Sequence, residues 1–282
     1  MKKNQYEENI DKAVVSDFGK EWEKFDQSEV PTEELKKSFD KYFSLFPWDI
    51  INDNSKGFDL GCGSGRWAYF AAQRVKTLHC IDPAYSALEV AKKKLKNSKK
   101  CIFHNVGVDN IPLEDGSMDF GYSLGVLHHM PNTQDGISKC VKKLKVGAPF
   151  LMYIYYAFDN RPSWFKVIWK ISDFFRKIIA VLPFPVKYLL SQIIAIFVYF
   201  PLSKISKFLD NIGIDVENIP LSSYKDKSFY SLRTDALDRF STKLEKRFTK
   251  DQIKKMLNNA NLEKIQFRNG DPYWCVIGYK KG

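Results

Sequence analysis

The chain has 282 residues, with 44 Lys or Arg against 33 Asp or Glu and a formal net charge of +11. An apolar fraction of 44% supplies a folded core and argues against a disordered chain. Five cysteines without a C-x-x-C pair argue against a disulfide framework and for a reducing compartment. Since the first residues also lack an apolar signal segment, we expect a cytoplasmic protein.

Two helices are predicted before residue 50. Residues 1–14 are polar, and we expect them to be frayed. Aromatic residues then recur with helical spacing at Phe18, Trp22 and Phe25. A second helix is predicted to begin at Thr32, because acidic residues follow it at once and apolar residues recur every three to four positions. The pattern indicates a packed helical pair.

A glycine-rich turn follows the first predicted strand, which covers residues 57–60. Glycine stands at every second position, at Gly61, Gly63 and Gly65. A sharp reversal and a ligand lying against bare backbone both require a residue without Cβ. Asp59 ends the strand, and its carboxylate suits a ligand with an ammonium group better than a phosphate. The spacing is neither the G-x-G-x-x-G of dinucleotide folds nor a P-loop.

Strand and helix patterns alternate through residues 57–155. The strands are predicted near 57–61, 77–82, 101–106, 118–124 and 147–155, and the helices near 66–75, 84–96 and 134–145. Parallel strands joined by crossover helices form a doubly wound α/β sheet. Ligands of such sheets bind at the carboxyl ends of the strands.

Three further motifs follow in order. Asp82 closes the second strand about 20 positions after the glycine turn, where an acidic residue can bond a ribose diol. The run V-G-V-D-N-I-P-L-E-D-G-S-M-D-F covers residues 106–120, and Y-S-L-G-V-L-H-H-M-P covers residues 122–131. With the glycine turn, these motifs resemble class I S-adenosylmethionine (SAM)-dependent methyltransferases, in particular the group that includes ubiquinone and menaquinone methyltransferases. The resemblance covers roughly residues 55–155 and 248–280.

The resemblance implies a Rossmann-like, seven-stranded sheet with SAM at its carboxyl edge. In the family, the acidic residue at Asp82 bonds the ribose, and Val108 and Asp109 flank the adenine. Gly107 departs from the family pattern, since many relatives carry Asp there. The implied cofactor-binding residues are Asp59, Gly61, Cys62, Gly63, Gly65, Asp82, Pro83, Val108, Asp109, Ser123 and Leu124.

Two histidines follow the fourth predicted strand, near the position where the methyl group of SAM should emerge. An oxygen nucleophile can need a general base, and His128 or His129 could serve. Histidine also has a structural or packing role at this place in many relatives. We rank that role first for both residues, with His129 slightly ahead of His128 as a catalytic candidate.

An insertion of changed composition, residues 156–246, precedes the last core helix. It is rich in aromatic, aliphatic and Lys residues. Its most apolar run, residues 188–202, is bounded by prolines and shorter than the roughly 20 residues that span a bilayer. Two interpretations stay open. The insertion is either a buried helical cap or dimer interface, or a segment that lies on an anionic membrane surface through residues 163–207.

The remaining elements complete the domain. A segment rich in paired charges, residues 229–248, lines the substrate side of the pocket in relatives, so Tyr230, Arg233 and Asp235 are substrate-contact candidates. A surface ion-pair network is the alternative for these residues. The last helix is predicted at residues 250–259, followed by two strands.

We therefore divide the chain into an N-terminal helical lid, a SAM-binding methyltransferase domain and a helical insertion. The lid is residues 1–50, the domain is residues 51–155 and 247–282, and the insertion is residues 156–246. The expected acceptor is a small molecule or a lipid- or sugar-linked metabolite, methylated at oxygen or carbon. An RNA methyltransferase and a non-catalytic SAM-binding interaction protein are the alternatives. The motifs of base methylation are missing, which argues against nucleic acid. No metal ligand cluster stands out, and an oligomer is an open option.

Overall fold

The structure is a computed structural model that describes residues 8–282. The chain divides into two compact units. Unit 1 runs from the first described residue to Gln27 and includes Leu35–Ala157 and Leu244–Gly282. Unit 2 comprises Ser28–Glu34 and Phe158–Lys243. Each unit is described by itself below.

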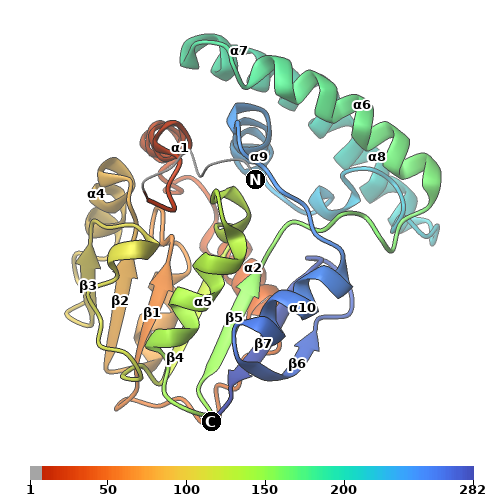
Figure 1. Ribbon diagram of the computed structural model, residues 1–282. Helices are drawn as coiled ribbons and strands as arrows, with labels where there is room; N and C mark the ends of the chain where they lie inside the picture. The colour runs from red at the N-terminus through yellow and green to blue at the C-terminus, as the bar shows by residue number, and fades with distance from the viewer. Residues whose placement is uncertain (1–7) are drawn as a thin grey trace, which may run out of the picture. The chain divides into compact units, whose positions relative to one another are not determined.

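Unit 1 is built on a seven-stranded sheet with the order β3-β2-β1-β4-β5-β7-β6 (Figure 1). The first five strands pair in parallel, and β7 lies antiparallel to both β5 and β6. The strands are β1 Lys56–Leu60, β2 Thr77–Ile81, β3 Cys101–His104, β4 Phe120–Leu124, β5 Pro149–Tyr153, β6 Leu262–Phe267 and β7 Cys275–Lys280. This order confirms the predicted Rossmann-like α/β fold.

Helices cover both faces of the sheet, and each face has its own apolar core. One core joins Phe58, Phe150 and Ile253 from β1, β5 and α10. The other joins Phe39 and Phe120 from α2 and β4. Figure 1 shows α5 and α10 crossing the first of these faces. The helices are α1 Lys12–Lys24, α2 Thr32–Tyr42, α3 Ala68–Ala71, α4 Tyr85–Lys94, α5 Thr133–Lys143 and α10 Lys250–Asn259.

The helix after the glycine turn is shorter than predicted. A regular helix was expected over residues 66–75, but α3 covers only Ala68–Ala71 and continues as a 3-10 turn, Ala72–Arg74. Val75 then has an extended backbone and is fully buried. Only two residues separate the 3-10 turn from the start of β2, so the chain must leave the helical conformation early. The close packing of this turn therefore overrides its helical pattern.

Unit 2 is helical. Its α-helices are α6 Ser163–Ile179, α7 Phe184–Ile194, α8 Phe200–Asn211 and α9 Phe229–Ser241. A π-helical turn, Ala195–Tyr199, joins α7 to α8 without a break. Its apolar core is small, and α9 contributes Leu232, Ala236 and Phe240 to it.

The joined helix Phe184–Asn211 corrects one expectation. It has 28 residues, a mean hydropathy of 1.6 in its most apolar window and 28% of that window buried. By length and composition alone it could cross a membrane. The estimate from residues 188–202 was too short because it treated Pro201 as an end. The π-helical turn instead carries the helix past that proline.

Because the sheet has an apolar core on each face, truncating a buried apolar side chain should change the free energy of unfolding far more than truncating an exposed one. Phe150 of β5 is fully buried, whereas Val146 before it is 69% exposed. Phe150→Ala should lower the free energy of unfolding by about 3–5 kcal/mol, since it leaves a cavity next to Phe58 in the core on one face of the sheet. Val146→Ala should change it by less than about 0.5 kcal/mol. Urea unfolding followed by circular dichroism measures both. Equal midpoints for the two variants would contradict this packing.

Candidate active site

The glycine turn joins β1 to α3 at the carboxyl edge of the sheet. Gly61, Gly63 and Gly65 have φ angles of +75°, +51° and +72°, a backbone region that residues with a Cβ atom rarely adopt. The N–H groups of Gly61 and Cys62 donate to the Ile81 carbonyl at 2.7 and 3.2 Å. The turn is therefore fixed to the end of β2 as well as to β1.

Trp22 of α1 lies directly against this turn. A Cβ at Gly63 would come within 3.0 Å of the Trp22 indole nitrogen. The Arg66 guanidinium, which follows the turn, sits 5.2 Å from the centre of the Trp22 ring. Trp22 was one of the residues expected in a lid, and α1 does cover the glycine turn. What α1 does for a bound cofactor stays a prediction.

Asp82 links the glycine turn to the start of α4. Its carboxylate accepts hydrogen bonds from the N–H groups of Gly63 at 2.9 Å and Ala84 at 2.8 Å. Burial raises the pKa of Asp82 to about 6, although these two hydrogen bonds oppose the shift. The carboxylate keeps further lone pairs for a second pair of donors, as a ribose diol would supply.

Asp59 lies near the carboxyl end of β1, at the same edge of the sheet, and its carboxylate is buried. It is 1% exposed, and its Oδ2 atom has no hydrogen-bond partner within residues 8–282. Tyr122 pairs with it in the register of β1 and β4, and the buried Tyr122 hydroxyl faces the Asp59 carboxylate, which opposes the rise in the Asp59 pKa although the two groups form no hydrogen bond of good geometry. Burial and the nearby Asp82 charge raise the pKa of Asp59 well above its usual range. An ammonium group would relieve both costs.

Some of the buried polar atoms without partners belong to the glycine turn and to the segment after β4. The Ser64 hydroxyl lies inside that turn, and both ring nitrogens of His128 follow the end of β4. Among the residues that the structure covers, none of these atoms has a hydrogen-bond partner. Buried polar groups are normally paired, so such a group of exceptions marks a place where a ligand can supply the partners.

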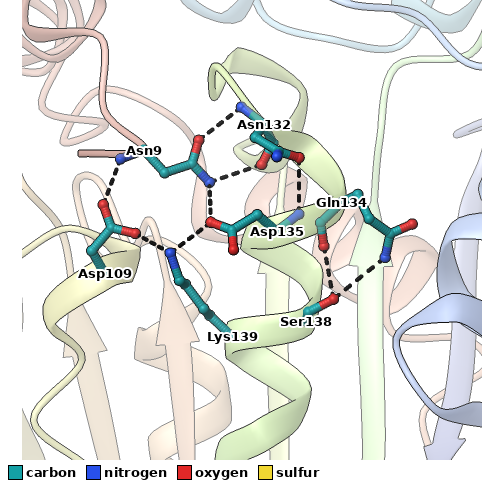
Figure 2. Close-up of polar contacts among 7 residues, drawn as sticks. All are labelled: Asn9, Asp109, Asn132, Gln134, Asp135, Ser138 and Lys139. Carbon is teal, nitrogen blue, oxygen red and sulfur yellow. Dashed lines mark hydrogen bonds and ion pairs between the residues drawn. The ribbon is translucent and has the colours of Figure 1, made fainter. Parts of the chain in front are cut away.

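Asp109 occupies the turn after β3, together with Val108. The carboxylate accepts from the backbone N–H of Asn9 and forms an ion pair with Lys139 of α5 (Figure 2). Val108 is buried in the core. The nearby Pro83 carbonyl accepts from the Asn105 amide at 3.0 Å. Asp109 therefore holds the N-terminal segment, and its expected contact with adenine stays a prediction.

Asn9 ties the N-terminal segment to α5. Its side-chain amide donates to the Asn132 carbonyl at 2.8 Å and to Asp135 at 3.1 Å, and its oxygen accepts from the Asn132 N–H at 2.7 Å (Figure 2). Asn9 is 8% exposed. The expectation of a frayed segment over residues 1–14 was wrong for residues 9–14, because these bonds join positions more than 120 apart. Residues 1–7 of that expectation lie outside the described chain.

Ser123 and Leu124 end β4 beside the turn. The Ser123 hydroxyl donates to the Leu60 carbonyl at 3.0 Å, and the residue is fully buried. This bond fixes the last residues of β1 and β4 to each other. Leu124 is 6% exposed and packs in the core with Tyr122. Ser123 thus positions the strand ends, and its expected contact with a cofactor is a prediction.

The two histidines have different surroundings. His128 is fully buried, and its ring stacks on Tyr155 with the centres 3.9 Å apart. Burial, with His129 and Arg247 nearby, lowers the pKa of His128 well below its usual range. The Nδ1 atom of His129 lies 2.7 Å from the Leu244 carbonyl, and its ring contacts Phe18 of α1. His128 is therefore neutral and weakly basic, which agrees with ranking a packing role first.

Sequence reasoning missed the neighbours of His128. Arg247 lies over the Tyr155 ring at 4.9 Å and is paired with Glu245 at 2.8 Å. These residues come from the end of β5 and from the approach to α10, so only the fold brings them to His128. Their aromatic and charged side chains carried no motif that marked them in the sequence.

The three substrate-contact candidates all lie on α9 of unit 2. Arg233 donates to Gln192 at 2.6 Å and to the Tyr188 hydroxyl at 3.1 Å, and Asp235 pairs with Lys227 at 3.1 Å. Tyr230 is half-buried, and its carbonyl accepts from Thr234. Within unit 2 these residues form a polar network, and substrate contact stays a prediction.

The contacts of Asn9 predict how firmly α1 is held. Asn9→Ala removes the three side-chain hydrogen bonds to Asn132 and Asp135, so α1 should open more often. Hydrogen exchange followed by mass spectrometry should show faster exchange in Lys12–Lys24, by about tenfold. Asn54→Ala, which changes an exposed turn, is the control and should leave this region unchanged. Unchanged exchange in α1 of Asn9→Ala would show that other contacts hold the helix.

Comparison with known proteins agrees with the fold. Residues 58–152 match the methyltransferase domain family, about a third of the chain. A search of curated proteins finds no match. A candidate methyltransferase from Bacillus halodurans is similar in structure, with a TM-score of 0.51 at 15% identity over 82% of this chain and 71% of that one.

A second similar structure comes from the complex between the Haloferax volcanii Trm112 methyltransferase activator and a candidate methyltransferase. It has a TM-score of 0.53 at 10% identity, over 94% of this chain and 98% of that one. At these identities the likeness is one of fold. The family match identifies residues 58–152 as a methyltransferase domain, which the fold agrees with, and the site supports SAM as its cofactor.

Proposed function

We propose that the protein transfers the methyl group of SAM to a small molecule or a lipid- or sugar-linked metabolite, at oxygen or carbon. One observation carries the cofactor part of the proposal. The buried carboxylate of Asp59, which has one oxygen without a hydrogen-bond partner of good geometry among residues 8–282, lies at the end of β1 just before the glycine turn, and the carboxylate of Asp82 accepts hydrogen bonds from the N–H groups of Gly63 and Ala84. These groups match an ammonium, a diol and a close backbone approach within one site.

Each residue would have a separate task with SAM bound, which supplies an electrophilic methyl group on its sulfonium. Asp59 would hold the ammonium group, and Asp82 would accept from the ribose hydroxyls. Trp22 would exclude water from the glycine turn. These roles need positioning more than proton transfer, because the reaction is an in-line displacement.

The acceptor part rests on the motifs and on His128. The motifs resemble those of the ubiquinone and menaquinone methyltransferase group, whose acceptors are small or lipid-linked. Since the neutral His128 is a weak base, the acceptor should be a carbon or oxygen nucleophile that ionises easily by itself. His129 is the second candidate for taking up a proton.

Binding of S-adenosylhomocysteine should depend on pH through Asp82. The carboxylate form accepts the hydroxyl protons, and it is lost as the pH falls through about 6. Affinity should therefore be full above pH 7 and roughly tenfold lower at pH 5. Asp82→Asn should bind roughly ten- to a hundredfold more weakly at pH 7 and depend less on pH. Isothermal titration calorimetry measures both proteins, and Asp115→Asn, an exposed acid, is the control. A variant as steep in pH as the wild type would remove Asp82 from this role.

Turnover separates an enzyme from a SAM-binding interaction protein. The protein, SAM and a cell extract that includes membranes should form S-adenosylhomocysteine, measured by mass spectrometry. Asp59→Asn should lose most of this signal, and Asp115→Asn should retain it. Binding without extract-dependent product would support the non-catalytic alternative. Absence of binding by the folded wild type would overturn the cofactor assignment itself.

A further inference from the structure

The helices of unit 2 bury polar side chains and expose apolar ones, which is the inverse of the usual arrangement. Their buried positions are mostly polar, which is unusual for a water-soluble helical unit. Between the start of α6 and the end of α8, Ile179, Ala180 and Ala195 are buried and have purely apolar side chains. The other buried side chains of these segments carry a polar group: Asp173, Arg176, Lys187, Ser191, Tyr199, Ser203 and Ser206.

The buried charged groups of α6 and α7 are paired or hydrogen-bonded, so the inversion is a stable arrangement. Arg176 pairs with Asp173 at 2.6 Å and donates to the Thr242 carbonyl at 2.6 Å. Lys187 donates to the Ser241 carbonyl at 3.1 Å. A buried charge that is paired and hydrogen-bonded holds its position. These contacts lock the polar sides of α6 and α7 inward, and the apolar sides must then face outward.

The outward faces of α6 and of the joined α7–α8 helix are strongly apolar. Phe174 is 62% exposed and Phe197 is 73% exposed. We call the set of exposed apolar side chains on these helices the apolar face. Its members are Trp164, Val167, Ile168, Ile171, Phe174, Phe175, Ile178, Val186, Leu189, Ile193, Ile196, Phe197, Val198, Phe200, Ile205 and Phe208. So many large, exposed apolar side chains on neighbouring segments of the chain are unusual for a water-soluble monomer and mark an interaction site.

Lysines line one side of the apolar face. In α6, Lys166, Lys170 and Lys177 are separated by four and seven residues, so they lie along one flank of the helix. Neither Lys166 nor Lys170 has an acidic partner in the part of the chain that the structure describes. Between residues 163 and 208 the sequence has seven Lys or Arg and one acidic residue, the buried Asp173. Since Arg176 and Lys187 are buried and Lys177 pairs with Asp173, the exposed positive charge of this flank of α6 comes mainly from Lys166 and Lys170.

We propose that the apolar face docks on the surface of an anionic lipid bilayer, with its lysines at the lipid phosphates. Apolar burial and charge attraction act together in such helices. A second copy fits less well. Equivalent faces meet across a two-fold axis, which would bring cationic flanks together without acids to neutralise them. This inference does not depend on the methyl-transfer reaction.

The lysine positions favour helices that lie in the membrane surface over helices that cross it. Along α6, Lys166 and Lys177 are about 16 Å apart at about 1.5 Å per residue. An upright α6 would carry one of them deep into the hydrocarbon. A helix that lies flat keeps all three lysines at the headgroups and inserts Phe174 and its neighbours.

Vesicle flotation tests the proposal with the full-length protein. The protein should float with vesicles of phosphatidylcholine and phosphatidylglycerol and at least about tenfold less with phosphatidylcholine alone. Binding should fall as salt rises. Emission of Trp164, which is 49% exposed on the apolar face, should shift to the blue on binding, and the shift should be smaller in Trp164→Phe.

Two matched pairs of variants separate the apolar and charge contributions. Phe174→Ser with Phe175→Ser should reduce flotation by more than about tenfold, whereas Val146→Ser, on an exposed residue of unit 1, should not. Lys166→Gln with Lys170→Gln should reduce flotation with anionic vesicles. Lys96→Gln with Lys99→Gln removes the same charge from unit 1 and is the control. All of these side chains are at least partly exposed, and circular dichroism checks that each variant folds.

Three outcomes would overturn the proposal. The wild type could remain at the bottom of the gradient with anionic vesicles at low salt. It could form a dimer that the phenylalanine variants dissociate, without any flotation, which would assign the apolar face to a second copy. It could stay with membranes through alkaline carbonate extraction, which would make Phe184–Asn211 a spanning helix instead of a surface one.

Discussion

The carboxylate of Asp82 is the interaction on which the rest of the site depends. Asp82 accepts hydrogen bonds from the N–H of Gly63, in the loop after β1, and from the N–H of Ala84, in the loop after β2. With the bonds to the Ile81 carbonyl, it fixes the ends of β1 and β2 to each other. Burying a charge there is costly, and two backbone donors offset only part of the cost, since the pKa of Asp82 stays raised. Further donors from a ligand would lower the energy of the same group.

Regular elements of unit 1 could be predicted from the sequence because their signals are local. The last helix has the predicted bounds, 250–259, since Thr249 and Gln252 form a capping box that is visible in the sequence. The alternation of strands and helices predicted the parallel part of the sheet. The glycine turn and Asp82 were found at the edge where the α/β rule places ligands.

The parts that sequence reasoning missed depend on distant partners. Asn9 is held by residues more than 120 positions away. The polar composition of the N-terminal segment therefore did not predict that it packs against α5. Tyr155 and Arg247 meet His128 only through the fold. The length of Phe184–Asn211 was underestimated because a π-helical turn carries the helix past Pro201, and a residue pattern does not reveal such a turn.

Charged groups are buried in both units, but with different results. In unit 2, Asp173, Arg176 and Lys187 are fully engaged with one another or with backbone carbonyls, and they stabilise one arrangement of helices. In unit 1, Asp59 and His128 carry buried atoms without partners. Each such atom costs roughly 1–3 kcal/mol. Selection for stability alone would remove that cost, so the unpartnered atoms of Asp59 and Ser64 at the glycine turn are consistent with a site shaped for a ligand. Because His128 is neutral there and stacked on Tyr155, the site can hold and orient an acceptor more readily than it can deprotonate one. Methyl transfer at this edge would then depend on alignment and exclusion of water, which are the properties that we propose for the strand ends and for Trp22, which lies against Gly63.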